Sequence, residues 1–315
     1  MTASRSAPRR PALNADLVAH WCGKYLSAAP VELLFETGYL AQIVGLRLDD
    51  GRYVVVKIRD WQDRLISCSR VQRWLFERGF PAPEPIVGPT TFDGYAVSAE
   101  MLLEGGQQLS DRPGAPGLFS SSLCHFVRLA PLPEQVGSLE PSPPWVGWDH
   151  SENQLWPKPD DRDGDLNAHN PGDWLDQIAS AVRGRLTAYA AVRVVGHGDW
   201  YSQNLHWVGD RLHAVHDWDS VVAQPEAAIA GHAAAVWPGT GGPGEVASIQ
   251  QTEEFIDGYS QARGRAWSRD ELEVAWAAGL WNRAFDAKKA SLVGDNTDLI
   301  LTRLEAAERT RRAGL

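Results

Sequence analysis

The 315-residue sequence contains little sulfur and no long apolar run. Its three cysteines (Cys22, Cys68 and Cys124) are odd in number, widely spaced and free of any C-x-x-C pair, which excludes a cysteine metal framework and suggests a reducing compartment. No apolar stretch approaches the ~20 residues that a membrane-spanning helix needs. Residues 1–10 carry arginines but are not followed by the apolar segment of a secretory signal. We therefore expect a cytoplasmic protein without a membrane partner, whose residues 1–10 form a disordered tail.

Basic residues are also in deficit, because 30 Lys and Arg face 40 Asp and Glu, a formal net charge of −10. This balance argues against non-specific nucleic-acid binding and is compatible with a cationic substrate. Tryptophan, in contrast, is abundant, with 14 residues. We favour packing between C-terminal helices as its role, with aromatic walls around a ligand pocket as the alternative.

The most informative stretch runs from His197 to Ser220 and is HGDWYSQNLHWVGDRLHAVHDWDS. Residues 205–208 and 211–215 alternate around Gly209-Asp210, which predicts a short β-hairpin. A two-residue turn places Asn204 opposite Val215, so that Asn204 and Asp217 meet at the open end of the hairpin. An H-G-D triplet alone is a weak signal, but five fixed positions joined by a hairpin are unlikely to arise by chance.

This arrangement suits phosphoryl transfer from a nucleotide. A carboxamide and a carboxylate can hold Mg²⁺ against phosphates, because Mg²⁺ prefers oxygen ligands and needs only one or two from the protein. We therefore expect Asn204 and Asp217 to be metal ligands. Asp199, one loop away, can accept a hydroxyl proton and orient the attacking oxygen.

The pattern of His197, Gly198 and Asp199, then Asn204, then Asp217-Trp218-Asp219, resembles the aminoglycoside phosphotransferase family, which is related to the protein kinases. In protein kinases the corresponding motifs are H-R-D-x-x-x-x-N and D-F-G. The resemblance implies Asp199 as catalytic base, Asn204 and Asp217 as Mg²⁺ ligands and His197 as a brace for the loop. For Asp219 two roles stay open, bracing the metal loop or facing the substrate.

The order of the expected elements fits an α+β, two-lobed protein-kinase-like fold. We expect a β-rich N-terminal nucleotide-binding lobe over 1–102 and a mainly helical C-terminal lobe over 103–315 that holds the catalytic loop and acceptor site. The expected strands are 31–35, 43–48, 52–58, 85–87 and 94–101, and the expected helices are 11–28, 59–79, 118–130, 173–192, 225–236, 244–261, 269–293 and 297–312.

Lys57 stands in an otherwise apolar strand, where a charge needs a partner or a ligand. The resemblance implies that it contacts the α- and β-phosphates, and an edge-strand lysine that discourages aggregation is the alternative. In the family, a glutamate of the following helix pairs with this lysine. The expected place falls near Cys68, where no acid occurs, so either Asp63 substitutes or Lys57 is held only by nucleotide and Asp217.

Three further nucleotide-binding residues follow from the resemblance. Gly38 lies in a turn that could cover the phosphates, although a single glycine is equally typical of an ordinary turn. Glu100 and Met101 fall in the segment between the lobes, where backbone groups of the family hydrogen-bond adenine.

Residues 131–172 are rich in Pro, Asp, Asn and Trp and have no periodicity. We expect a long loop whose acidic run at 160–165 is solvated, with recognition of a cationic substrate as the alternative. Acids available for an acceptor amine are Asp173, Glu226, Glu254, Asp257 and Asp286.

The sequence therefore predicts a small-molecule kinase that uses Mg²⁺ and ATP or GTP. Its acceptor is a small hydroxyl compound, for which a cationic, aminoglycoside-like molecule fits the net charge. The alternative is a nucleotide-binding pseudokinase that acts as an interaction protein. A protein kinase is disfavoured, because the residues after Ser220 leave no room for an activation loop.

Overall fold

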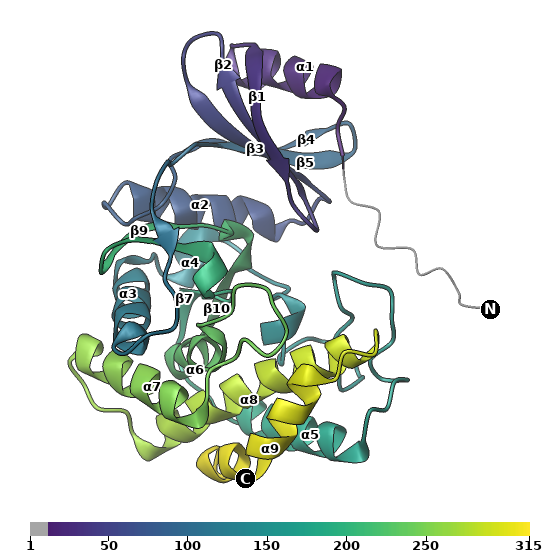
Figure 1. Ribbon diagram of the computed structural model, residues 1–315, viewed down its shortest axis with the longest axis vertical. Helices are drawn as coiled ribbons and strands as arrows, with labels where there is room; N and C mark the ends of the chain where they lie inside the picture. Colours follow the sequence, from purple (N-terminus) through teal and green to yellow (C-terminus); the bar gives the residue numbers. More distant parts are fainter. Residues whose placement is uncertain (1–11) are drawn as a thin grey trace.

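The computed structural model describes residues 12–315, so the expected tail at 1–10 lies outside the described residues. The N-terminal part is a five-stranded antiparallel sheet in the order β1-β2-β3-β5-β4. Figure 1 shows helix α1 against this sheet at one end of the molecule, with the mainly helical part at the other. The elements here are α1 (Ala15–Leu26), β1 (Pro30–Thr37), β2 (Gln42–Leu48), β3 (Tyr53–Arg59), α2 (Arg64–Phe76), β4 (Pro85–Phe92) and β5 (Tyr95–Met101).

The two faces of this sheet have different partners because side chains alternate along each strand. Val54, Val56 and Ile58 of β3 are fully buried in one core with Trp21 and Cys22 of α1. The residues between them, including Lys57 and Arg59, point to the opposite face. This alternation explains how a charged residue can stand in an apolar strand.

Helix α2 lies between the sheet and the helical part (Figure 1), and its apolar face belongs to the helical part. Its buried residues Cys68, Val71 and Leu75 join the same core as Phe119 and Phe126. That core is separate from the one beneath α1. Helix α2 is therefore packed as part of the C-terminal lobe, although it lies in the N-terminal half of the sequence.

The C-terminal lobe is built around the long helix α8. Two small sheets, β10-β7 and β6-β8-β9, carry the catalytic segment across the top of the helices. No helix among residues 12–315 is both long and apolar enough to cross a bilayer. The elements are β6 (Gln107–Gln108), α3 (Ala115–Leu129), α4 (Pro133–Val136), α5 (Asp173–Thr187), β7 (Arg193–His197), β8 (Leu205–Val208), β9 (Arg211–Val215), β10 (Val221–Pro225), α6 (Glu226–Val236), α7 (Ile249–Arg263), α8 (Arg269–Ser291) and α9 (Thr297–Arg312), with short 3-10 turns η1 (Pro144–Val146), η2 (Ser202–Asn204) and η3 (Trp218–Ser220).

The α+β architecture and the central hairpin are confirmed, with three local corrections. The hairpin pairs Leu205 with Val215, and the His216 amide donates to the Asn204 carbonyl at 2.9 Å, so Asn204 lies opposite His216, one residue beyond the expected partner. Helix α2 begins at Arg64, five residues later than expected. Strands β7 and β10, which the sequence analysis missed, pair with each other on either side of the hairpin.

Residues 131–172 form a long segment with little regular structure, as expected, but parts of it are buried. Trp148, Trp156 and Leu166 are buried in the main core, since the segment packs on α5 and α8. Within the acidic run, Asp160, Asp163 and Asp165 are exposed, but Asp161 is buried beside Arg162 and Lys289. Most tryptophans are core residues, but they are not confined to contacts between C-terminal helices as expected, since Trp21 packs in the core beneath α1 and Trp207 lies on β8. The buried ones are Trp21, Trp148, Trp156, Trp200, Trp207, Trp218, Trp237, Trp267, Trp276 and Trp281.

The close crossing of α6 and α8 yields a stability prediction. A Cβ at Gly231 would overlap the backbone carbonyl of Ala275, so Gly231→Ala must push the two helices apart. We expect a loss of about 3 kcal/mol in the free energy of unfolding, measured by urea denaturation. Gly184→Ala in α5 is the matched control, because nothing lies within 4 Å of its added Cβ. It should stabilise by roughly 0.5–1 kcal/mol through helix propensity, and equal effects of the two changes would contradict the packing argument.

Candidate active site

His197, at the end of β7, holds in place the loop of residues 197–204, which carries Asp199 and Asn204. Its ring is 1% exposed. Nδ1 accepts a hydrogen bond from the Asp199 amide at 3.1 Å, so Nε2 carries the hydrogen and donates to the His216 carbonyl at 3.1 Å. Burial lowers the pKa of His197 to about 4, which keeps the ring neutral and able to accept this bond at neutral pH. These contacts fit the expected role of His197 as a brace.

Asn204 fixes the Asp199 carboxylate. The Asn204 Nδ2 donates to Asp199 Oδ2 at 2.6 Å and to the Asp199 carbonyl at 3.0 Å. The five-residue spacing closes through the 3-10 turn η2, which brings the amide back over the loop. Because Nδ2 donates to Asp199, the side-chain oxygen of Asn204 is available to bind another group. It accepts no hydrogen bond from residues 12–315.

Asp199 and Asp217 are neighbouring, partly buried carboxylates. Burial and the charge of Asp217 raise the pKa of Asp199 well above its usual range. Burial alone would raise the pKa of Asp217 too, but the charges of Arg59 and Lys57 and a side-chain hydrogen bond with Asp199 outweigh burial and lower it. Asp217 itself adopts a left-handed conformation with φ 62°, and Ser220 Oγ donates to its Oδ2 at 3.2 Å.

The side-chain oxygen atoms of Asp199, Asp217 and Asn204 fit a magnesium ion. Two adjacent carboxylates repel each other, a cost that a cation would relieve, and the oxygen of Asn204 completes a set of hard ligands. No group of three or more His, Cys, Asp or Glu side chains in the described part of the chain could hold a metal ion. A Mg²⁺ bound largely by phosphates and waters does not require such a group.

Lys57 forms an ion pair, but its partner is neither Asp63 nor Asp217, the two acids suggested from the sequence. Its Nζ lies 2.9 Å from Glu100 Oε1 on the adjacent strand β5. Asp63 precedes α2, is exposed, and accepts a hydrogen bond from the Trp61 indole at 2.9 Å. Both expected explanations for the missing helix acid are therefore replaced by Glu100, and the edge-strand role is wrong because β3 lies inside the sheet.

A second cation, Arg59, lies two residues after Lys57 on the same face of β3. It forms an ion pair with Asp219. From α2, Arg64 donates to the backbone carbonyls of Asp219, Val221 (2.5 Å) and Leu139 (3.0 Å). Of the two roles left open for Asp219, its contact with Arg59 fits the brace of the metal loop. The period of two along β3 could have drawn attention to Arg59 from the sequence.

Gly38 and Met101 lie at two different places on the N-terminal sheet, Gly38 in the turn between β1 and β2 and Met101 at the end of β5. Gly38 has φ 112°, and a Cβ there would overlap the Ala41 carbonyl, so the turn between β1 and β2 requires glycine. The next residue, Tyr39, donates its hydroxyl to the Asp161 carbonyl of the other lobe at 3.2 Å. Met101 ends β5, and its amide donates to the Glu84 carbonyl at 2.8 Å.

On the helical side of the cleft, Asp286 of α8 is the acid nearest to the catalytic loop. It approaches the Tyr201 hydroxyl at 3.5 Å and Lys289 at 3.6 Å, and its charge contributes to the raised pKa of Asp199. Lys289 also lies 3.4 Å from Asp161. Sequence reasoning missed Tyr201 and Lys289, since neither belongs to a motif.

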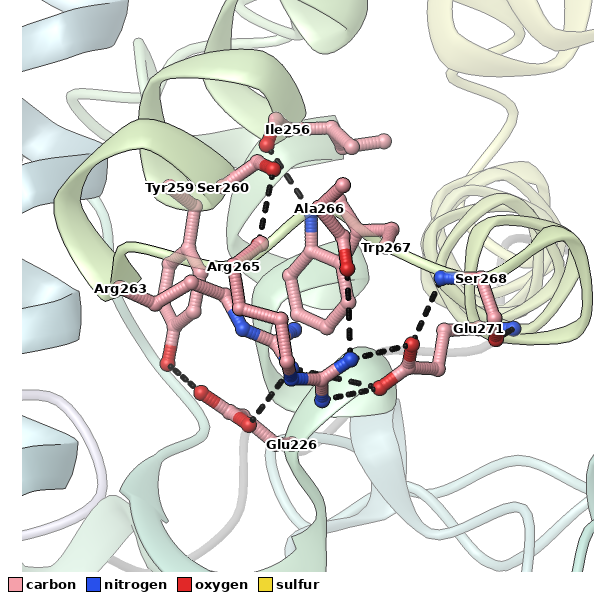
Figure 2. A network of polar contacts seen from close by, with 10 residues as sticks. All are labelled: Glu226, Ile256, Tyr259, Ser260, Arg263, Arg265, Ala266, Trp267, Ser268 and Glu271. Atoms are coloured by element: carbon pink, nitrogen blue, oxygen red, sulfur yellow. Dashed lines mark hydrogen bonds and ion pairs between the residues drawn. The ribbon is translucent and has the colours of Figure 1, made fainter.

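The other acids proposed for an acceptor have different surroundings. Glu226 belongs to a polar network at the junction of α6, α7 and α8 (Figure 2), where it accepts from the Tyr259 hydroxyl at 3.1 Å and lies 3.5 Å from Arg263. Asp173 accepts from Asn170, and Glu254 from Gln250, both at exposed positions, and Asp257 of α7 is exposed as well. These contacts favour Asp286 among the five acids.

The fold and the site together define a kinase-like phosphotransferase. The family described as "Phosphotransferase enzyme family" matches residues 33–272. The chain belongs to this family, and it is a phosphotransferase that acts on a hydroxyl acceptor. No curated protein sequence matches the chain.

Solved structures share the fold at low sequence identity. The amicoumacin kinase hAmiN, in complex with AMP-PNP, Ca²⁺ and Ami, is 12% identical with a TM-score of 0.65 and covers 95% of this chain and 94% of its own. An aminoglycoside phosphotransferase from Alicyclobacillus acidocaldarius is 13% identical with a TM-score of 0.58, covering 99% and 96%. Spectinomycin phosphotransferase in complex with ADP and spectinomycin is 12% identical with a TM-score of 0.57, covering 95% and 94%. The protein-kinase-like fold is thereby confirmed.

The Arg59–Asp219 pair gives a stability prediction that does not depend on activity. Arg59→Met leaves the Asp219 carboxylate without its cation. Since Asp219 keeps 31% of its side chain exposed, we expect a loss of about 2 kcal/mol in the free energy of unfolding, below that of a fully buried pair. Adding Asp219→Asn should restore part of the loss. Arg47→Met, which breaks an exposed pair with Glu32, is the control and should cost at most about 0.5 kcal/mol. Urea denaturation measures all four proteins, and equal losses for the two arginines would refute the argument.

Proposed function

We propose that this protein is a small-molecule kinase that transfers the γ-phosphoryl group of ATP or GTP to a hydroxyl of a small, positively charged acceptor. The observation that carries the proposal is the arrangement around Asp199. Asn204 fixes its carboxylate, and His197 fixes its backbone. Asp217 lies beside it, and the charge of Lys57 on β3 acts on Asp217. Phosphoryl transfer asks mainly for positioning and charge stabilisation, which this arrangement supplies.

In the proposed reaction, Asp199 accepts the hydrogen bond of the acceptor hydroxyl and takes its proton as the oxygen attacks phosphorus. Its raised pKa makes it a better base than an ordinary carboxylate. Asn204 and Asp217 would hold Mg²⁺, which supplies charge neutralisation on the phosphates when bound. Lys57 draws the α- and β-phosphates into line, and Arg59 holds the loop that carries Asp217 by pairing with Asp219.

The nucleotide is placed by the expected residues of the N-terminal sheet. Gly38 would let the turn between β1 and β2 approach the phosphates, and the base would lie at the segment of Glu100 and Met101. The Met101 amide already donates to the Glu84 carbonyl, so other backbone groups of this segment would have to bind the base. The solved structures of similar fold contain AMP-PNP or ADP, which supports a nucleotide co-substrate. We place the boundary between the lobes at residues 102–103, just after β5.

The acceptor would lie on the helical side of Asp199, near Tyr201 and Asp286. Acids outnumber cations there, since Asp160, Asp161 and Asp286 lie near two cations, Lys289 and Arg162. Such a surface favours an acceptor that carries an amine. The structures of similar fold include kinases with Ami and spectinomycin bound, in line with a small-molecule acceptor.

The proposed base can be tested with Asp199→Ala. Turnover should fall by about 100-fold or more because general-base catalysis is lost, while nucleotide binding is retained. The measurement is nucleotide consumption with Mg²⁺ across a panel of amine- and hydroxyl-bearing acceptors, with the variant as blank. Acceptor-dependent turnover that disappears in the variant supports a kinase and gives the acceptor class. Wild-type turnover in Asp199→Ala would overturn the assignment, and nucleotide binding without stimulation by any acceptor would favour an interaction protein.

Asp217→Ala tests the metal ligand separately. The variant should weaken binding of the Mg²⁺–nucleotide complex, because the anionic one of the two proposed protein ligands is lost, but should leave metal-free nucleotide binding nearly unchanged. Isothermal titration of ATP with Mg²⁺ and with EDTA gives both affinities. Unchanged affinity for the Mg²⁺ complex would remove Asp217 from the metal site.

A further inference from the structure

The phosphate-binding lysine has an acid partner that comes from an unexpected element. Helix α2 has the sequence RLISCSRVQRWLF and contains no acidic residue. The partner of Lys57 is instead Glu100 on β5, at 2.9 Å. Strands β3 and β5 are hydrogen-bonded neighbours in which Lys57 lies opposite Ser98 and Glu100 lies opposite Val55. Lys57 and Glu100 are thus diagonal neighbours on one face of the sheet.

Burial of the pair shows that the contact is more than a surface ion pair. The side chains of Lys57 and Glu100 are 13% and 7% exposed. A buried carboxylate requires all of its oxygen atoms to be satisfied. The second oxygen, Oε2, accepts a hydrogen bond from Gln72 Nε2 at 2.8 Å, and the same Nε2 donates to the Pro83 carbonyl at 3.0 Å.

Helix α2 therefore contributes a neutral amide where an acid was expected. Gln72 is 5% exposed and lines a cavity of about 40 Å³ together with Lys57, Arg59 and Glu100. Since α2 is packed into the core of the C-terminal lobe, a pairing acid on α2 would tie the lysine to that lobe. The Lys57–Glu100 pair instead lies within one sheet, and α2 contributes to it only the neutral amide of Gln72.

We propose that Glu100 is the positioning residue that orients Lys57 toward the nucleotide phosphates, and that Gln72 orients Glu100. This inference rests on the proposed function, because it takes Lys57 as the phosphate ligand. The charged partner of Lys57 therefore comes from the sheet. Helix α2 contributes only the neutral amide of Gln72, which orients this partner.

The test compares ligands with and without phosphates. For Glu100→Gln, the affinity for ATP should fall about tenfold through loss of an oriented, charged hydrogen-bond donor. Affinity for adenosine should stay unchanged, and KM for ATP should rise more than kcat falls. A general disturbance of the fold would weaken both ligands equally. Glu84→Gln is the control, because it removes a carboxylate at an exposed position just before β4 and should leave both affinities unchanged.

A double-mutant cycle shows whether Glu100 acts through Lys57. Lys57→Met should weaken ATP binding, and adding Glu100→Gln should cause no further loss, because the oriented group is already absent. If Glu100→Gln is too unstable, Lys57→Met/Glu100→Met removes both charges of the pair and is compared with Lys57→Met alone. Isothermal titration with ATP and adenosine measures every protein.

Each outcome decides the matter. Selective, non-additive loss of ATP affinity supports the proposal. Unchanged ATP affinity in Glu100→Gln, equal losses for ATP and adenosine, or additive losses in the cycle would each overturn it while leaving the kinase assignment intact. A wild-type protein that binds neither ATP nor adenosine would instead overturn the proposed function, and this inference with it.

Discussion

The side-by-side placement of two carboxylates, Asp199 and Asp217, is the constraint on which the cleft depends. Partly buried like charges are costly, and the surrounding residues reduce that cost. Asn204 donates to Asp199, while Lys57 and Arg59 offset the charge of Asp217. Burial and the same repulsion raise the pKa of Asp199, and the repulsion makes the pair receptive to a cation. The repulsion between the two carboxylates therefore underlies both the energetic cost of the site and its ability to attract a cation.

The second organising feature is the position of α2 at the boundary between the lobes. Its apolar side belongs to the core of the helical lobe, while its polar residues reach the sheet and the metal loop. Arg64 binds the backbone carbonyls after Asp217, and Gln72 binds Glu100. Since Lys57 takes its acid from β5, α2 contributes a neutral amide to the Lys57–Glu100 pair and a charged donor to the loop after Asp217.

Departures from the protein-kinase pattern are compensated by residues nearby in space. The acid expected near Cys68 is missing, yet a carboxylate reaches Lys57 from a residue 43 positions later in the sequence. Trp218-Asp219, which replaces the Phe-Gly of protein kinases, is accompanied by Arg59, which pairs with Asp219. Compensation of this kind is invisible to motif reasoning, because a motif records positions in the chain and a contact depends on which faces the fold brings together.

The sequence by itself determined the local features: the strand and helix order, the hairpin at 205–215, and the spacing of Asp199, Asn204 and Asp217. These follow from periodicity and turn chemistry over a few residues, and the hairpin expectation failed by only one residue in register. The tertiary structure alone decided that Glu100 pairs with Lys57, that α2 belongs to the helical core and that Asp161 is buried beside Lys289. The physical reason is that these contacts join segments far apart in the chain, and burial selects partners by shape and charge rather than by sequence distance.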